Sequence, residues 1–230
     1  KLNIIGATGC YTLNELPMAF RSVGPGLMFD EPCPMPGMFI GDIRDGIADT
    51  GVRAGALKCA IDMAGLTDGV ERVMRAVAKA QLATGAPISV HTAPAAGTGL
   101  MAQRVLAEEG VDLRDVIIGH SGDGMDRFGI NLGVTQGERV ATIVELVRRG
   151  FLDRIALSHD CYCWTNLHPG GKPALPTHNY LTVSTQVIPA LIEAGLTRDQ
   201  VEVMLVDNPR RHFVDAAERH AARTSIPMPG

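Results

Sequence analysis

Short apolar runs alternate with amphipathic stretches of helical period along most of this chain of 230 residues. Apolar runs of this length, separated by helices, are typical of strands that are buried on both faces of a parallel sheet. Each pair of parallel neighbours needs a crossover connection, which is usually a helix. The pattern therefore predicts an α/β protein built from repeated strand–helix units. The expected strands are 2–8, 55–61, 87–92, 115–120, 125–130 and 154–159.

Residues that start and stop helices punctuate the stretches between these strands. Thr67 and Thr197 stand where an N-cap hydroxyl can accept a hydrogen bond from the first turn of a helix. Gly110, Gly150 and Gly195 stand where a helix ends in a left-handed residue. The expected helices are 68–83, 99–109, 137–149, 183–194 and 198–205, with a further helical stretch from Pro209 towards Ala222.

The composition excludes several classes of protein. Hydrophobic residues make up 46% and charged residues 20% of the chain, which excludes a disordered chain. Aromatic residues are only 4% and the net charge is −4, so we expect no nucleic-acid partner. No apolar run approaches the ~18 residues that span a bilayer, so we expect no membrane partner either. Five cysteines, an odd number, indicate reduced thiols and a cytoplasmic location. We expect a single domain over 1–230.

Four side chains able to bind a metal stand at or near the ends of the expected strands. They are Lys58, His91, His120 and Asp160. A lone His at a strand end is more often a buried, hydrogen-bonded imidazole than a ligand. In a (β/α)8 barrel, however, the C-terminal strand ends build one catalytic face, so four such residues favour a shared site.

The spacing of these residues also indicates that parts of a barrel are absent. Lys58 to His91 is 33 residues and His91 to His120 is 29, each the length of one strand–helix unit. Only a few residues join His120 to the strand 125–130, whereas a parallel crossover needs at least ~10–12. Six strands are expected here, and a closed barrel has eight. We therefore predict an incomplete (β/α)8 barrel that lacks two strands and one connection, with a break or a displaced strand near 122–125.

Several sequence stretches, in order along nearly the whole chain, resemble one enzyme family. They include Asn3 to Tyr11 (NIIGATGCY), Ala56 to Ala60 (ALKCA), ISVHT at 88–92, VIIGHSGD at 116–123, MDRFG at 125–129 and LSHD at 157–160. Asp207-Asn208-Pro209 also resembles a motif that closes the same family. The family is the phosphotriesterase family of the amidohydrolase superfamily, which includes the phosphotriesterase-like lactonases.

The resemblance implies a metal-dependent hydrolase with two divalent metal ions, commonly zinc, with manganese, cobalt and iron as alternatives. Lys58 matches a lysine that CO2 carboxylates and that then bridges the two metals. His91 and His120 match the two ligands of the more exposed metal. Asp160 matches the ligand of the buried metal that also accepts a proton in catalysis. A metal-bound hydroxide would attack P=O or C=O.

Tyr11 and Arg127 match positions that line the substrate pocket of the family, and Trp164 lies in the loop after the last strand, which shapes that pocket in the family. Together with the metal ligands, they imply a small-molecule substrate, which is an organophosphate triester, an ester or a lactone. The resemblance is compatible with a homodimer.

One departure from the family pattern leaves a second hypothesis open. The sequence contains no His-x-His pair, which the first strand of the family's barrel carries to complete the buried metal site. The resemblance therefore implies that the first two strands of the barrel are the ones absent. Lys58 and Asp160 alone are too few ligands for a stable zinc site. The alternative is therefore a catalytically inactive, truncated barrel or fragment. Lys58 argues against that alternative, because an unmodified ammonium group repels metals and has no evident use among metal ligands.

Overall fold

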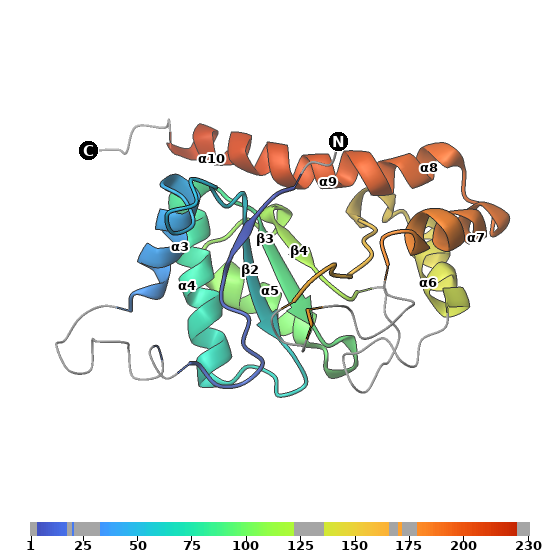
Figure 1. The fold of residues 1–230 in the computed structure, drawn as a ribbon. Helices are drawn as coiled ribbons and strands as arrows, with labels where there is room; N and C mark the ends of the chain where they lie inside the picture. Colours follow the sequence, from blue (N-terminus) through green and yellow to red (C-terminus); the bar gives the residue numbers. More distant parts are fainter. Residues whose placement is uncertain are drawn as a thin grey trace. The chain divides into compact units, whose positions relative to one another are not determined.

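The computed structural model of the chain describes residues 4–17, 20, 33–121, 136–165, 170–171 and 179–224 (Figure 1). It divides into two compact units. Unit 1 comprises Lys1–Gly133 and Arg211–Gly230, and unit 2 comprises Val134–Arg210. A single domain over 1–230 stays a prediction.

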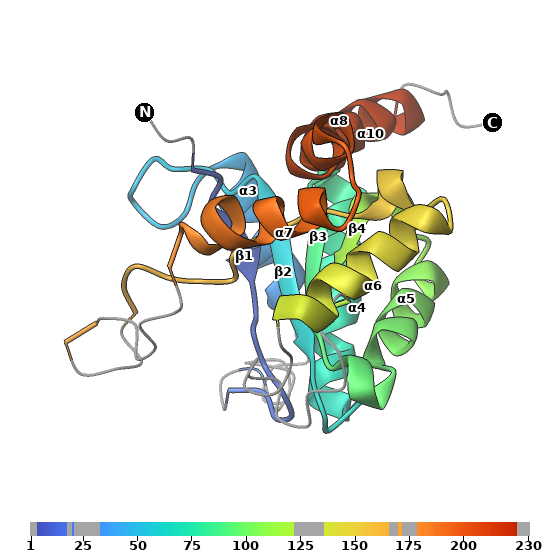
Figure 2. The same ribbon diagram turned by 90° about the vertical axis from the view of Figure 1, so that its right-hand side faces the viewer.

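A four-stranded parallel sheet forms the centre of unit 1, with the strands in the order β1-β2-β3-β4 (Figure 2). The strands are β1 (Ala7–Gly9), β2 (Ala56–Ile61), β3 (Ile88–Thr92) and β4 (Val116–Ile118). Each falls within or at the end of an expected strand. The predicted α/β class with a parallel sheet is therefore confirmed, and its strands follow one another in space as they do in sequence.

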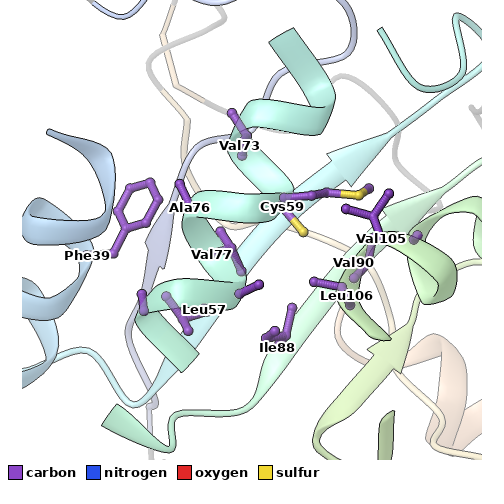
Figure 3. Packing of buried hydrophobic residues seen from close by; sticks show 14 of the residues in the cluster. Phe39, Leu57, Cys59, Val73, Ala76, Val77, Ile88, Val90, Val105 and Leu106 are labelled. Atoms are coloured by element: carbon purple, nitrogen blue, oxygen red, sulfur yellow. The ribbon is translucent and has the colours of Figure 1, made fainter. Parts of the chain in front are cut away.

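Helices connect these strands and cover one face of the sheet. They are α3 (Met35–Arg44), α4 (Asp68–Thr84) and α5 (Thr98–Glu108), with short 3-10 turns at Pro94–Ala96 and Leu113–Asp115. Figure 3 shows apolar side chains of the three helices meeting those of β2 and β3 in one cluster. Its labelled members are Phe39, Leu57, Cys59, Val73, Ala76, Val77, Ile88, Val90, Val105 and Leu106.

The expected helix caps are present in the structure. The Thr67 hydroxyl accepts a hydrogen bond from the Val70 amide at 3.3 Å, and α4 ends at Gly85 in the left-handed region, with a φ of 74°. A cap of this kind stabilises a helix by about 1 kcal/mol. These local signals fixed the start and end of α4, which the sequence predicted as 68–83.

The C-terminal part of unit 1 consists of a π-helical turn, Arg211–Asp215, and α10 (Ala216–Thr224). Arg219 of α10 donates to one oxygen of Asp115 at 2.8 Å from Nε and 2.6 Å from Nη2. Gln81 donates to the other oxygen at 3.0 Å. Asp115 is fully buried, so removal of Arg219 would leave an uncompensated charge in the protein interior. This ion pair fixes α10 at the start of β4.

Unit 2 is mainly helical in its described part. It contains α6 (Gln136–Arg148), a 3-10 turn Leu152–Arg154, a π-helical turn Val183–Val187, α7 (Ile188–Glu193), α8 (Arg198–Glu202), a π-helical turn Val203–Asp207 and α9 (Asn208–Arg210). A second apolar cluster holds these elements together, with Leu191 and Met204 fully buried. The predicted Thr197 cap is present as a capping box with Gln200.

The prediction of a strand over 154–159 is wrong. The described residues 155–163 form no strand, although the backbone at Ile155 is extended. A strand needs a neighbouring strand to bond with, and the Leu157 amide bonds instead to the Met204 carbonyl, at 3.4 Å. The expected strand 125–130 and the predicted break at 122–125 lie outside the described residues. No helix among the described residues combines the length and the apolar character needed to cross a membrane.

Candidate active site

The parallel register of β2 and β3 places Lys58 and His91 on the same face of the sheet. Lys58 pairs with Ser89, and Ala60 pairs with His91. Side chains of paired residues point to the same side, and so do side chains two positions apart. The residues between them, including Cys59, point to the helix-covered core. The sheet therefore has an apolar face and a polar one, and both candidate ligands lie on the polar face. Lys58 lies in the middle of β2 rather than at its end.

His120 lies against His91 just beyond the end of β4. The two imidazole rings are 4.5 Å apart between centroids, at 73°. The backbone of Gly119 brings them together, because its amide donates to the Val90 carbonyl at 2.7 Å and its carbonyl accepts from the Thr92 hydroxyl at 2.7 Å. A Cβ on Gly119 would lie 2.9 Å from the Val90 oxygen, so only glycine allows this approach.

Tyr11 completes the group of site residues in unit 1. It follows β1, its ring centroid is 5.3 Å from that of His91, and the Lys58 Nζ is 5.9 Å from its centre. Tyr11 is 54% exposed, so a ligand can reach it. The structure thus brings together four of the residues that the sequence singled out: Lys58, His91, His120 and Tyr11.

The immediate partners of Lys58 and His91 are polar residues that sequence analysis missed. The Lys58 Nζ lies 3.5 Å from the Ser89 hydroxyl, and the His91 Nε2 lies 3.1 Å from the Asp62 Oδ2. The alternation of side chains along the two strands could have indicated both residues. Asp62 continues the alternation of Lys58 and Ala60 past the end of β2, and Ser89 is two residues before His91.

Burial keeps His91 uncharged. His91 is 7% exposed, and loss of solvation lowers its pKa below the usual value. The hydrogen bond to Asp62 opposes this effect, whereas the positive potential of His120 adds to it. A neutral imidazole is the form that binds a metal ion, so the environment of His91 favours a ligand.

Two of the candidate ligands have an unusual backbone. His120 has a φ of 60° and Asp160 a φ of 46°; Ala48 is the third non-glycine residue with a positive φ in the described part of the chain. This left-handed conformation costs about 1–2 kcal/mol for a residue with a Cβ. Such strain is often found at functional sites.

Asp160 and Trp164 lie in unit 2. Asp160 is exposed, on the irregular segment that follows Ile155. Trp164 is 65% exposed, and its indole lies against Gly171, where a Cβ would come within 2.0 Å of the Trp164 Nε1. His159 has a buried Nε2 atom with no hydrogen-bond partner among the described residues, and its ring is 6.0 Å from that of Tyr180.

The segment that carries Asp160 is held by Asn208, the central residue of the Asp207-Asn208-Pro209 motif. Its side-chain amide donates to the carbonyls of Leu152 at 2.8 Å and Ile155 at 2.6 Å. The Tyr180 hydroxyl donates to the carbonyl of Cys161 at 3.1 Å. Among the described residues, these contacts position the segment, and no strand ladder does. Arg127 lies outside the described residues.

The donors described in unit 1 fit part of a metal site. Within the described residues, no three His, Cys, Asp or Glu side chains gather closely enough to hold an ion. Two imidazoles and a lysine on one face nevertheless offer nitrogen donors, and the lysine becomes an oxygen donor only if it is carboxylated. The convergence of all four predicted ligands stays a prediction.

Comparison with known proteins gives the context for this arrangement. The sequence profile of the phosphotriesterase family matches residues 1–213. The chain belongs to that family. A phosphotriesterase homology protein of Mycobacterium tuberculosis is 47% identical, over 93% of this chain and 71% of the relative. An aryldialkylphosphatase of Saccharolobus solfataricus is 34% identical, over 92% of this chain and 72% of the relative.

Comparison with solved structures gives the same family as the sequence comparison. The phosphotriesterase from Mycobacterium tuberculosis superposes with a TM-score of 0.84 at 46% identity, covering 93% of this chain and 72% of that chain. More distantly, an N-acetyltaurine hydrolase of Salmo salar is 25% identical, over 92% of this chain and 65% of the relative. The predicted family is confirmed, and the chain is a phosphotriesterase-family hydrolase with the α/β fold of a phosphotriesterase barrel.

Proposed function

We propose that this family member is a metal-dependent hydrolase of phosphotriesters, lactones or both, with Lys58, His91, His120 and Asp160 as its metal ligands. The observation that carries the proposal is the shared polar face of β2 and β3, where the rings of His91 and His120 are 4.5 Å apart. A lysine on that face has a purpose if CO2 converts it into an anionic ligand.

Two divalent metal ions, with zinc as the first candidate, would supply an activated nucleophile and polarise the P=O or C=O bond. The residues of the chain have separate tasks. His91 is kept neutral and therefore able to donate a lone pair. Asp160 would accept the proton that is released during hydrolysis. Tyr11, Arg127 and Trp164 would contact the substrate and its leaving group.

The substrate proposed first is an aryl phosphotriester. The 34% identical relative is named as an aryldialkylphosphatase, whereas the N-acetyltaurine hydrolase is only 25% identical. A lactone is the second candidate. Hydrolysis of a lactone and of a phosphotriester both need an activated nucleophile and a polarised oxygen, at C=O or at P=O. Both substrates are small molecules.

The experiment compares Lys58→Ala with Lys79→Ala, an exposed lysine on α4. We expect the parent chain to bind divalent metal and to hydrolyse an aryl phosphotriester or an acyl homoserine lactone. Lys58→Ala should lose metal, measured by elemental analysis, and activity together, and Lys79→Ala should retain both. Full metal occupancy in Lys58→Ala would contradict the bridging role. A parent chain without metal or activity would favour the inactive barrel.

A further inference from the structure

One carboxylate oxygen of Asp62, Oδ2, lies 3.1 Å from the Nε2 ring nitrogen of His91. We propose that Asp62 is a positioning residue, which holds the proton of His91 on Nε2 and thereby presents Nδ1 as the metal-binding nitrogen. The inference rests on the proposed function, because it assigns a task to a neighbour of a proposed ligand. It concerns a residue that is not among the candidate ligands.

The fold places Asp62 beside His91. Asp62 lies on the same side of the chain as Ala60, whose register partner is His91. Its Oδ1 accepts a hydrogen bond from the Met63 amide at 2.7 Å, which orients the carboxylate and leaves Oδ2 at 3.1 Å from the His91 Nε2. The side chain of Asp62 is 16% exposed and that of His91 is 9% exposed, so solvent competes weakly for the contact.

Chemistry then determines which nitrogen carries the proton. A carboxylate can only accept hydrogen bonds, and a neutral imidazole has one N–H group and one lone pair. Oδ2 therefore favours the tautomer with hydrogen on Nε2, and the lone pair is left on Nδ1. A carboxylate partner of this kind fixes the orientation of a ligating imidazole and raises its basicity. The loss of such a partner typically lowers metal affinity by about 10–100-fold.

Three variants isolate this effect. Asp62→Ala removes the acceptor. Asp62→Asn has a single oxygen, which the Met63 amide occupies, so its NH2 group faces the His91 Nε2 as a donor. Asp49→Asn makes the same charge change at an exposed carboxylate. The first measurement is the tautomer of His91 in metal-free chains labelled with 15N-histidine, by long-range 1H–15N correlation. The second is the Zn²⁺ dissociation constant, by competition with a chromophoric chelator.

We expect an Nε2–H tautomer in the parent chain and in Asp49→Asn, a mixture of tautomers in Asp62→Ala, and a shift towards the Nδ1–H tautomer in Asp62→Asn. Zinc should bind about 10–100-fold more weakly to Asp62→Ala and to Asp62→Asn, and within a few-fold of the parent to Asp49→Asn. An unchanged tautomer in Asp62→Ala would overturn the inference, because a merely structural carboxylate would leave it in place.

A fourth variant, His91→Ala, separates this inference from the proposed function. If His91→Ala weakens zinc binding and Asp62→Ala does not, His91 is a ligand and the positioning role of Asp62 is wrong. If His91→Ala leaves zinc affinity unchanged, the ligand assignment itself is wrong, and the metal-binding part of the inference is overturned with it.

Discussion

The candidate site residues of unit 1 and those of unit 2 are positioned in different ways. Lys58 and His91 stand in a hydrogen-bonded parallel ladder, whose register decides which face each side chain occupies. Asp160 and Trp164 stand on a segment with no ladder among its described residues, where single side chains such as Asn208 make the contacts. In a ladder, many backbone hydrogen bonds together hold each side chain in position. In the segment of unit 2, a few side-chain hydrogen bonds do so.

This difference shows where each set of candidate residues is vulnerable. A change at one strand residue leaves most of the ladder intact, because the backbone bonds remain. A change at Asn208 removes two contacts at once. The chemistry of Lys58 and His91 should therefore tolerate substitutions around them better than that of Asp160 does.

The largest expected effect tests that vulnerability directly. Asn208 is 8% exposed, and Asn208→Ala leaves the carbonyls of Leu152 and Ile155 without their amide donor. We expect a loss of about 2–3 kcal/mol in the free energy of unfolding and a loss of hydrolysis that exceeds the loss of folded chain. Denaturant unfolding and an activity assay measure the two effects.

Gln186→Ala is the matched control for this prediction. Gln186 also lies in unit 2 and also carries an amide, but its side chain is exposed. An exposed substitution of this kind should change stability by less than about 0.5 kcal/mol. Equal effects of the two substitutions would show that the segment is not held by Asn208.

The same difference explains what the sequence could and could not predict. Period and caps sufficed for β2, β3 and α4, since each combines an apolar pattern with a local stop signal. The side-by-side placement of Lys58 and His91 followed from consecutive parallel strands. The prediction of a strand at 154–159 was wrong, because an apolar run does not reveal whether a neighbouring strand is present to pair with it. Asp62 was missed because a carboxylate after a strand resembles an ordinary turn residue until the register is known.

A second prediction sharpens the comparison from the side of unit 1 and concerns acid stability. His212 is 6% exposed, and burial lowers its pKa from 6.5 to about 4. The unfolded chain therefore binds a proton at a higher pH than the folded chain does. Stability from this group is fully present above the unfolded pKa and is lost as the pH falls towards 4.

The loss should amount to about 2 kcal/mol between pH 7.5 and pH 5, to judge from these two pKa values. His212→Gln has no ionisable group there and should lose correspondingly less stability over this interval. Urea unfolding of both chains at the two pH values measures the difference. Equal pH dependence would mean that His212 does not titrate differently in the folded and unfolded chains.

The smallest expected effect concerns backbone strain at the site. His120 has a φ of 60°, a conformation that glycine adopts without a Cβ penalty. His120→Gly and His120→Ala both remove the imidazole, so the difference between them reports the backbone alone. We expect the glycine variant to be more stable by about 0.5–1 kcal/mol, which is the steric relief less the entropy that glycine loses on folding.

Ala48, with a φ of 49°, is the control outside the proposed site. Ala48→Gly should gain similar stability and keep full activity, whereas both His120 variants should lose zinc and hydrolysis. If His120→Gly is no more stable than His120→Ala while Ala48→Gly is stabilised, His120 is not strained in the folded chain, and the strain assigned to the site disappears.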